Sequence, residues 1–536
     1  MQENSSLNSD VQYNPGRKTR FLLMGLLVIL NIVIRTPSIP HEKGFDSFFI
    51  HSLANSVTNF GVAKWWINWM SVFGLYPYSY ASAVPFTLSG MSQLTGIRME
   101  IVILLFCVIL GLFSIFASYS LATVLYDNFL HRFLFAAIFS LSAGTLNLTT
   151  WEITTRAQTQ VFLPFLIYLV FQMVKKPKVR YVVLFIITAA FVLATHHFVY
   201  IALFYSGIII TCALLYKLNN RSKYLGIQIA QLRVINLNYI YILTIFLLLI
   251  LIFLFGTKWG LITSGSRYAW IIDIGIITGR NVGFILPISI GGLIYCIFKK
   301  NKLLEEWAIL ICLLPTLIFS LNQTYGYLTT YLFITLLGSV GLFNVIKNQK
   351  QNSKIVATTV IIFLVLNVAF STFFVHYRLG MGGGNYEWYM SEETYITGEW
   401  IKEKISWDKN AVSNSMQGDR LFASYGGQPV LYLDDINNYM NGFVTLNESD
   451  IEQTSMFSKS FYLDNPYVLK PGTTTSGLYN WISLYPITNE NSINFLSGNN
   501  ISYFFDDKYR TNTLFNSLPQ NKNSIYNSGR MQIWEN

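Results

Sequence analysis

Hydrophobic and polar positions alternate along this chain on the scale of whole segments. Apolar runs of about 15 to 25 residues are separated by short polar patches, which is the pattern of a polytopic helical membrane protein. The runs predict about eleven membrane-spanning helices. We place these spans at residues 21–36, 99–125, 131–148, 159–174, 181–196, 199–216, 237–256, 274–298, 306–321, 326–346 and 355–376.

A long stretch between the first two spans, residues 37–98, is too polar to cross a bilayer as a whole. Residues 80–96 are barely long enough to span and contain Pro85, two glycines and many hydroxyl side chains, so we predict that this segment does not cross. Earlier in the stretch, apolar residues recur at steps of three and four, and tryptophans continue the series. This spacing predicts one or two amphipathic helices lying at the outer membrane surface. The apolar series consists of Phe49, Leu53, Val57, Phe60, Trp65, Trp66 and Trp69.

Charge supports this topology. Only 12% of the residues are charged, whereas an ordinary soluble domain carries about 25%. The net charge of +10 comes mainly from short basic clusters between spans, which are typical of cytoplasmic loops. With a cytoplasmic N-terminus, the clusters at 175–180, 217–223, 299–302 and 347–354 all fall on the cytoplasmic side. We therefore expect a multi-pass cell-membrane protein that contacts lipids and does not bind nucleic acid.

The last part of the chain changes character after a glycine-rich hinge at 380–384. The segment "SEETYITGEWIKEKI" predicts a helix capped by Ser391, and "PVLYLDD" and "NISYFFDD" predict short strands. The predicted fold class is an α-helical polytopic membrane protein with a C-terminal extracytoplasmic α/β domain. The predicted divisions are a cytoplasmic tail at 1–20, a transmembrane domain at 21–378 and a soluble domain at 379–536. The four cysteines lie in apolar runs, so no disulfide framework is predicted.

Ionisable residues beside membrane spans are costly, so each is a candidate functional group. Asp46 opens the long outer loop, either as the N-cap of a helix or as a general base or metal ligand. Glu152 and Arg156 follow in the next outer loop, four residues apart, a spacing that permits an ion pair within one helix. Two acidic groups from successive outer loops can share a divalent cation or divide base and binding roles between them.

Further basic and aromatic residues lie at other outer ends of the spans. His196 and His197 form a turn that suits one imidazole contacting a phosphate, or a structural turn whose histidines bond to the backbone. Arg267, Tyr268 and Arg378 suit either phosphate binding or anchoring at the membrane interface. Motifs of soluble enzymes, such as a P-loop, GxSxG or HExxH, are absent from the sequence.

The order of these features resembles the GT-C superfamily of membrane glycosyltransferases, most closely the first third of oligosaccharyltransferase catalytic subunits. Asp46 matches the early aspartate of that family, "INW" ending at Trp69 and Tyr76–Pro77 match the following motif, and Glu152 falls at the second acidic motif. The match covers residues 20–175. The Trp-Trp-Asp signature of the oligosaccharyltransferase soluble domain is absent, so transfer of a single sugar is expected, as in the lipid-linked mannosyl- and aminoarabinosyl-transferase branches.

The resemblance implies a polyprenyl-phosphate sugar as donor and a lipid, glycan or protein as acceptor, with inversion at the anomeric carbon. Asp46 would then orient or deprotonate the acceptor, and Glu152 would hold Arg156 or a divalent cation, Mg or Mn, against the headgroup. Arg267, Arg378 or His196 would stabilise the leaving phosphate. The alternatives are a transporter or flippase of lipid-linked glycans, a scaffold or sensor with an outer domain, and a polysaccharide polymerase or ligase.

Overall fold

The fold was analysed in a computed structural model of the full chain. The structure describes residues 15–36, 39–61, 82–196, 199–224, 278–279, 281–300, 302–322, 326–348, 358, 362, 364–371, 390–405, 409–415, 430–432, 482–498 and 501–536.

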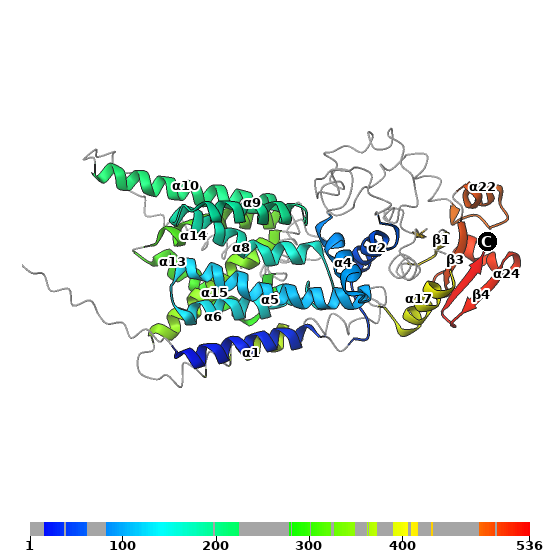
Figure 1. The fold of residues 1–536 in the computed structure, drawn as a ribbon, viewed down its shortest axis with the longest axis horizontal. Helices are drawn as coiled ribbons and strands as arrows, with labels where there is room; N and C mark the ends of the chain where they lie inside the picture. The colour runs from blue at the N-terminus through cyan, green and yellow to red at the C-terminus, as the bar shows by residue number, and fades with distance from the viewer. Residues whose placement is uncertain are drawn as a thin grey trace, which may run out of the picture.

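Most of the described chain is helical (Figure 1). The bundle contains α1 Arg17–Arg35, α5 Met99–Leu125, α6 Phe129–Leu141, α7 Ala143–Leu146, α8 Thr155–Lys175, α9 Val179–Leu193, α10 Val199–Tyr224, α13 Leu286–Phe298, α14 Leu304–Asn322 and α15 Gly326–Asn348, with the short 3-10 helix η1 Gly283–Ile285 before α13.

Within the described residues, four helices are long and apolar enough to cross a membrane: α5, α8, α10 and α15. Three shorter apolar helices, α6, α9 and the η1–α13 segment, accompany them. This places the chain in a membrane, while the predicted count of about eleven spans stays a prediction, because the span at 237–256 and much of that at 355–376 lie outside the described residues.

The predicted span 131–148 is wrong in its length. The helix begins at Phe129, where Asn128 caps it through Leu130 N–H, and it ends at Leu141. Ser142 then adopts an extended backbone before the four-residue helix α7. Ser142 and Thr145 bond to the Tyr331 hydroxyl, which donates to the Phe139 carbonyl oxygen at 2.7 Å. A backbone carbonyl beside the break therefore has a side-chain partner inside the bundle.

Two further helices, α2 Phe45–Phe60 and α4 Ala83–Thr95, lie between the bundle and the C-terminal sheet (Figure 1). The apolar spacing predicted α2 correctly, but not its surroundings. Leu53 and Val57 are buried, and Ile50 and Ala54 of α2 pack with Val84 and Leu88 of α4, so α2 packs on protein instead of lying in lipid. The α4 helix has only 13 residues and is too short to span a bilayer, as predicted.

Glycines bring α13 and α15 into backbone contact, a packing mode typical of membrane helices. A Cβ atom added at Gly292 would lie 2.0 Å from the Leu337 carbonyl oxygen and 2.9 Å from the Gly341 nitrogen. Gly341 in turn faces the Ile288 carbonyl oxygen, 2.5 Å from where its Cβ would be. Larger side chains cannot be accommodated at this crossing without moving one helix.

One end of the bundle, here called the basic end, carries charged residues that satisfy each other. Lys175 of α8 pairs with Glu305 at 2.6 Å, and Lys299 pairs with Glu306 at 2.7 Å. The Tyr126 hydroxyl also donates to Glu306, at 2.8 Å. These contacts join the ends of four helices. The other end, the domain end, carries α2, α4 and the C-terminal sheet (Figure 1).

The C-terminal part forms a five-stranded sheet of order β2-β1-β3-β5-β4. The strands β1, β2 and β3 are parallel, and β5 pairs antiparallel with β3 and β4. Side chains along a strand alternate between the two faces of the sheet, so successive residues of β3 pack in different hydrophobic cores. Phe504 packs with Trp534, whereas Phe505 packs with Ile401 of α17. The elements are α17 Glu392–Lys404, β1 Asn410–Ser413, β2 Val430–Tyr432, α22 Glu490–Gly498, β3 Ile501–Asp507, α23 Thr513–Asn516, α24 Leu518–Asn521, β4 Asn523–Asn527 and β5 Met531–Glu535.

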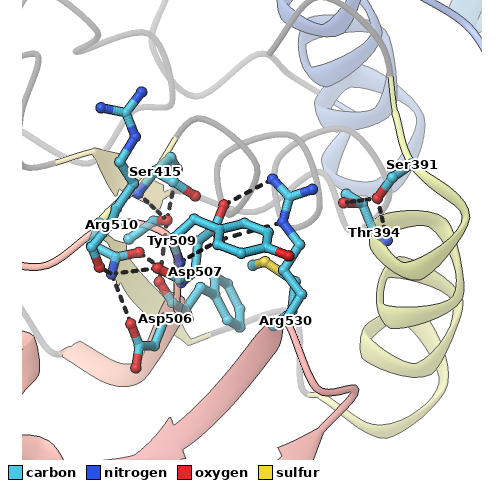
Figure 2. Close-up of polar contacts among 12 residues, drawn as sticks. Ser391, Thr394, Ser415, Asp506, Asp507, Tyr509, Arg510 and Arg530 are labelled. Carbon is cyan, nitrogen blue, oxygen red and sulfur yellow. Dashed lines mark hydrogen bonds and ion pairs between the residues drawn. The ribbon is translucent and has the colours of Figure 1, made fainter. Parts of the chain in front are cut away.

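Polar contacts at the ends of the parallel strands stabilise this sheet (Figure 2). Asn414, just after β1, donates to the Asp506 carboxylate at 2.7 Å and accepts from the Asp507 N–H at 2.8 Å. The buried Asp507 carboxylate pairs with Arg530 at 3.1 Å. Ser391 caps α17 by accepting from Thr394 N–H, as the sequence predicts. The predicted α/β character of this region is therefore confirmed.

We predict that Gly292→Ala destabilises the bundle by about 1–3 kcal/mol, because the added methyl group overpacks a backbone contact. Thermal unfolding of the detergent-solubilised protein measures the loss. The matched control is Gly291→Ala, whose Cβ would meet nothing within 4 Å. Equal effects of the two substitutions would contradict a specific α13–α15 contact.

Candidate functional site

Two segments far apart in the sequence are joined at the domain end: residues 41–47, which lead into α2, and residues 151–156, which lead into α8. Lys43 N–H donates to the Trp151 carbonyl oxygen at 3.1 Å, and Ile153 N–H donates to Ser47 Oγ at 3.1 Å. Trp151 has a left-handed backbone, with φ of 49°, which is unusual for so bulky a residue. Its indole N–H donates to the Glu100 carbonyl oxygen at 3.2 Å, which holds this turn against α5.

A buried ion pair lies inside this junction. Lys43 Nζ is 2.6 Å from Glu152 Oε2, and the two side chains are only 3% and 5% exposed. Gly44 makes room for it: a Cβ there would lie 2.7 Å from Glu152 Cδ, and the residue has φ of +94°. Glycine is therefore required at this position both by its backbone conformation and by the Glu152 side chain.

A second ion pair joins the first turns of α2 and α8 through Asp46 and Arg156. The Asp46 side chain is 39% exposed and that of Arg156 is 24% exposed, so this pair faces outward from the buried one. Helix N-termini carry partial positive charge from unpaired N–H groups. Asp46 and Arg156 lie in the first turns of α2 and α8, so two helix N-termini, which favour anions, lie beside this ion pair.

Behind the ion pairs, Arg35 at the end of α1 is fully buried. Its guanidinium donates to Asn31 Oδ1 at 2.7 Å, to Ser140 O at 3.0 Å and to Thr149 Oγ1 at 3.0 Å. It also packs on Gly111 of α5, one turn from Cys107, whose thiol contacts the Glu152 carbonyl oxygen. Within the described chain, these hydrogen bonds of the Arg35 guanidinium go to neutral oxygens.

Comparison with known proteins bears on the fold. The sequence matches no family model and no curated protein. Among solved structures, an Archaeoglobus fulgidus oligosaccharyltransferase tethered with an acceptor peptide matches with a TM-score of 0.55 at 12% identity, covering 92% of this chain and 69% of that one. ArnT from Cupriavidus metallidurans bound to undecaprenyl phosphate matches with a TM-score of 0.50 at 12% identity. The match covers 97% of this chain and 98% of ArnT. The mycobacterial arabinofuranosyltransferase AftD matches with a TM-score of 0.52 at 12% identity. The match covers 97% of this chain and 40% of the AftD chain.

All three of these structures are GT-C glycosyltransferases. This chain has the GT-C fold. The resemblance predicted from Asp46, Trp69, Tyr76–Pro77 and Glu152 is thereby confirmed for the fold, although "INW" and "YP" themselves lie outside the described residues.

Two expectations about Asp46, Glu152 and Arg156 are wrong. Asp46 is not the N-cap of α2; Gly44 holds that position, and Asp46 lies in the first turn. Glu152 and Arg156 do not pair within one helix, because α8 begins only at Thr155, after its cap Thr154. Each instead takes a partner from the other segment, Glu152 with Lys43 and Arg156 with Asp46.

The donor set was tested against the divalent cation expected between Asp46 and Glu152. Another structure of the Archaeoglobus enzyme is a complex with Zn and sulfate. In the described part of this GT-C chain, no group of three or more His, Cys, Asp or Glu residues is arranged to hold a metal ion. Both carboxylates already face basic side chains, and Lys43 lies where a shared cation would neutralise Glu152. The residues as they stand therefore do not fit a divalent cation.

The remaining predicted residues are placed only in part. His196 is buried in the turn after α9, and the neighbouring Ala194 carbonyl accepts from Ala83 N–H of α4 at 3.0 Å. This puts His196 at the domain end. His197, Arg267, Tyr268 and Arg378 lie outside the described residues, so their roles stay predictions.

Sequence reasoning missed three charged residues, His41, Glu42 and Lys43. His41 contacts Glu100 and Glu392, and Glu42 pairs with His51 of α2 at 2.7 Å. The available signal was the density of charge in "HEKGFD", directly after a membrane span, where ionisable residues are costly.

We predict that Lys43→Met destabilises the protein by about 3–5 kcal/mol, since it leaves the Glu152 carboxylate buried without its partner. The double variant Lys43→Met with Glu152→Met should recover most of that loss, because no buried charge remains. Thermal unfolding in detergent measures both. A double variant as unstable as the single one would show that the pair is not buried as described.

Gly44→Ala should destabilise the protein more than Gly96→Ala. Both glycines have positive φ, so both substitutions incur backbone strain of about 1 kcal/mol or more. Only at Gly44 does the new methyl group also meet another side chain, that of Glu152. Equal shifts in the unfolding temperature would mean that backbone strain alone explains the need for glycine.

Proposed function

We propose that this chain is a membrane glycosyltransferase that moves a sugar from a polyprenyl-phosphate donor to an acceptor hydroxyl at the domain end. The observation that carries the proposal is the junction of residues 41–47 and 151–156. It presents a partly exposed carboxylate, Asp46, beside Arg156 and two helix N-termini. The GT-C fold, with a relative solved bound to undecaprenyl phosphate, supports this reading.

The proposed reaction is a single displacement at the anomeric carbon. The acceptor oxygen forms the new glycosidic bond and loses its proton to the Asp46 carboxylate. The bond from the anomeric carbon to the phosphate oxygen breaks, and its electron pair leaves with the polyprenyl phosphate. Attack from the face opposite the phosphate inverts the configuration. Asp46 suits the base role because it is 39% exposed, whereas Glu152 is shielded.

Arg156 has two tasks in this proposal. One N–H group orients the Asp46 carboxylate, and the planar guanidinium has further N–H groups that suit phosphate oxygens. Phosphate charge grows as the sugar departs, so fixed cations and helix N-termini near the headgroup stabilise the transition state more than the ground state. In this proposal Arg35, bonded to Thr149, adds to the field at longer range.

Lys43 and Glu152 act as positioning residues here. Their ion pair holds the backbone that carries Asp46 against the backbone that carries Arg156. The polyprenyl chain requires an apolar path from the bilayer, and α1, α9 and α10 expose large apolar side chains along the bundle surface. We further propose that the domain end is extracytoplasmic, since the clusters at 175–180 and 299–302 lie at the basic end.

Asp46→Asn should reduce sugar transfer by about 10²–10⁴-fold, the usual contribution of a general base. The assay offers radiolabelled polyprenyl-phosphate sugars, with a membrane extract as acceptor source, to the purified protein in nanodiscs. Binding of undecaprenyl phosphate should persist, because Arg156 and both helix N-termini remain.

The matched control is Asp127→Asn, an exposed aspartate at the basic end that also pairs with an arginine, Arg132. It should transfer at the wild-type rate. Wild-type transfer by Asp46→Asn would remove Asp46 from the mechanism. Absence of transfer by the wild-type protein with every sugar and extract offered, despite binding of undecaprenyl phosphate, would favour the transporter alternative.

A further inference from the structure

His41 lies between two carboxylates that belong to different parts of the fold. Its Nδ1 atom is 3.1 Å from Glu100 Oε1, in the first turn of α5. Its Nε2 atom is 3.1 Å from Glu392 Oε2, in the first turn of α17. The His41 side chain is only 9% exposed, and that of Glu100 is 7% exposed. The ring therefore bridges the bundle and the C-terminal sheet region.

This geometry determines the protonation state of the ring. An ionised carboxylate only accepts hydrogen bonds, and a neutral imidazole has one N–H donor and one acceptor nitrogen. A neutral His41 would place a lone pair against one of the two carboxylates. Both contacts are satisfied together only by an imidazolium, which donates from both nitrogens.

Other contacts between α17 and the bundle surround His41. The Tyr395 ring stacks on the His41 ring, with centroids 3.8 Å apart. Arg98, just before α5, bonds to Glu399 and to the Tyr395 hydroxyl at 2.9 Å. The α17 helix thus contacts the start of α5 and the segment that leads into α2 at once.

An apolar contact extends this docking into α2. Phe48 of α2 packs with Met390, just before α17, and with Tyr395. Phe48 follows Asp46 by two residues, so α17 touches the same helical turn that carries the proposed base.

We propose that His41 is a positioning residue whose imidazolium fastens α17 to residues 41–47 and so holds Lys43 and Asp46 in their places. The helix α17 is then part of the candidate active site and not only part of a separate domain. The inference rests on the proposed function only for the consequence that loss of this clamp slows sugar transfer.

The clamp should weaken as pH rises. Burial lowers the pKa of His41, but hydrogen bonds to Glu100 and Glu392 outweigh it, so the pKa is raised above the ordinary value. A group whose pKa is higher in the folded state stabilises that state below its unfolded pKa. This contribution is lost as pH rises through the folded pKa.

Several other titratable groups lie near the His41 ring. Glu100 of α5 and Glu392 of α17 face the ring directly, Tyr395 of α17 stacks on it, and the Arg98–Glu399 pair lies beside it. Next to it in sequence, Glu42 pairs with His51 of α2. His51 is a second histidine beside residues 41–47, so it needs its own control.

Hydrogen exchange of the full chain in nanodiscs, followed by mass spectrometry from about pH 5.5 to about pH 9, tests the proposal across the range of histidine titration. Protection factors are calculated against intrinsic exchange rates, so that the effect of pH on exchange chemistry is removed. For the wild type, protection of α17 and of residues 41–47 should fall together by about tenfold as His41 deprotonates, the size expected for charge-assisted hydrogen bonds.

Four variants locate the effect. His41→Gln should show the low protection at every pH, and His41→Lys, which keeps a positive charge, should restore protection and remove the pH dependence. Glu392→Gln, at an exposed side chain that folding tolerates, should move the transition to lower pH, because the ring loses one anionic partner. His51→Asn should leave the transition unchanged.

A pH-independent wild type, or a transition that disappears in His51→Asn and persists in His41→Lys, would overturn the proposal. Loss of protection in α17 alone, with residues 41–47 unaffected, would also overturn it, because the two would then be uncoupled. These readouts need no substrate, so they remain decisive if the chain transfers no sugar. With an active enzyme, His41→Lys should flatten the alkaline limb of the pH–rate profile.

Discussion

The Lys43–Glu152 ion pair constrains the whole domain end. Both side chains are almost completely removed from water, which is unfavourable for each charge unless the partner stays in place. The residues belong to segments separated by more than one hundred positions, and those segments connect α1 to α2 and α7 to α8. Keeping the pair together therefore fixes where two helices begin. Hydrogen bonds from the backbone N–H groups of Lys43 and Ile153 also fix the relative orientation of the two segments.

The two ends of the bundle use their charges differently. At the basic end, Lys175 and Lys299 are neutralised by Glu305 and Glu306. At the domain end, the starts of α2 and α8 converge, and Arg35 bonds there to neutral oxygens. Helix N-termini favour negative charge nearby, so the starts of α2 and α8 add positive potential on the side of the Asp46–Arg156 pair. An anionic lipid headgroup would be attracted to that side, whereas sites of transporters are typically at mid-membrane.

Sequence periodicity was enough to locate most helices, because apolar runs and their polar breaks are local signals. The cost of ionisable groups beside membrane spans singled out Asp46 and Glu152 as candidates. Periodicity did not reveal the partners. Arg156 stands four residues from Glu152, so local spacing favoured that pair, yet the chain folds so that Arg156 meets Asp46 and Lys43 meets Glu152. Only tertiary structure decides between such alternatives. The break at Ser142 was missed for the same reason, because Tyr331, which satisfies it, is distant in sequence.

A buried ion pair with a lysine depends on its surroundings differently from a bound metal ion. A divalent cation binds according to its free concentration and must displace protons from its ligands. Lys43 is supplied by the chain itself, so Glu152 is neutralised whenever residues 41–47 are folded against residues 151–156. The integrity of the site then depends on folding of that junction. Contacts that hold the junction from outside, such as those of α17 with His41 and Phe48, therefore act on the same site from the C-terminal region.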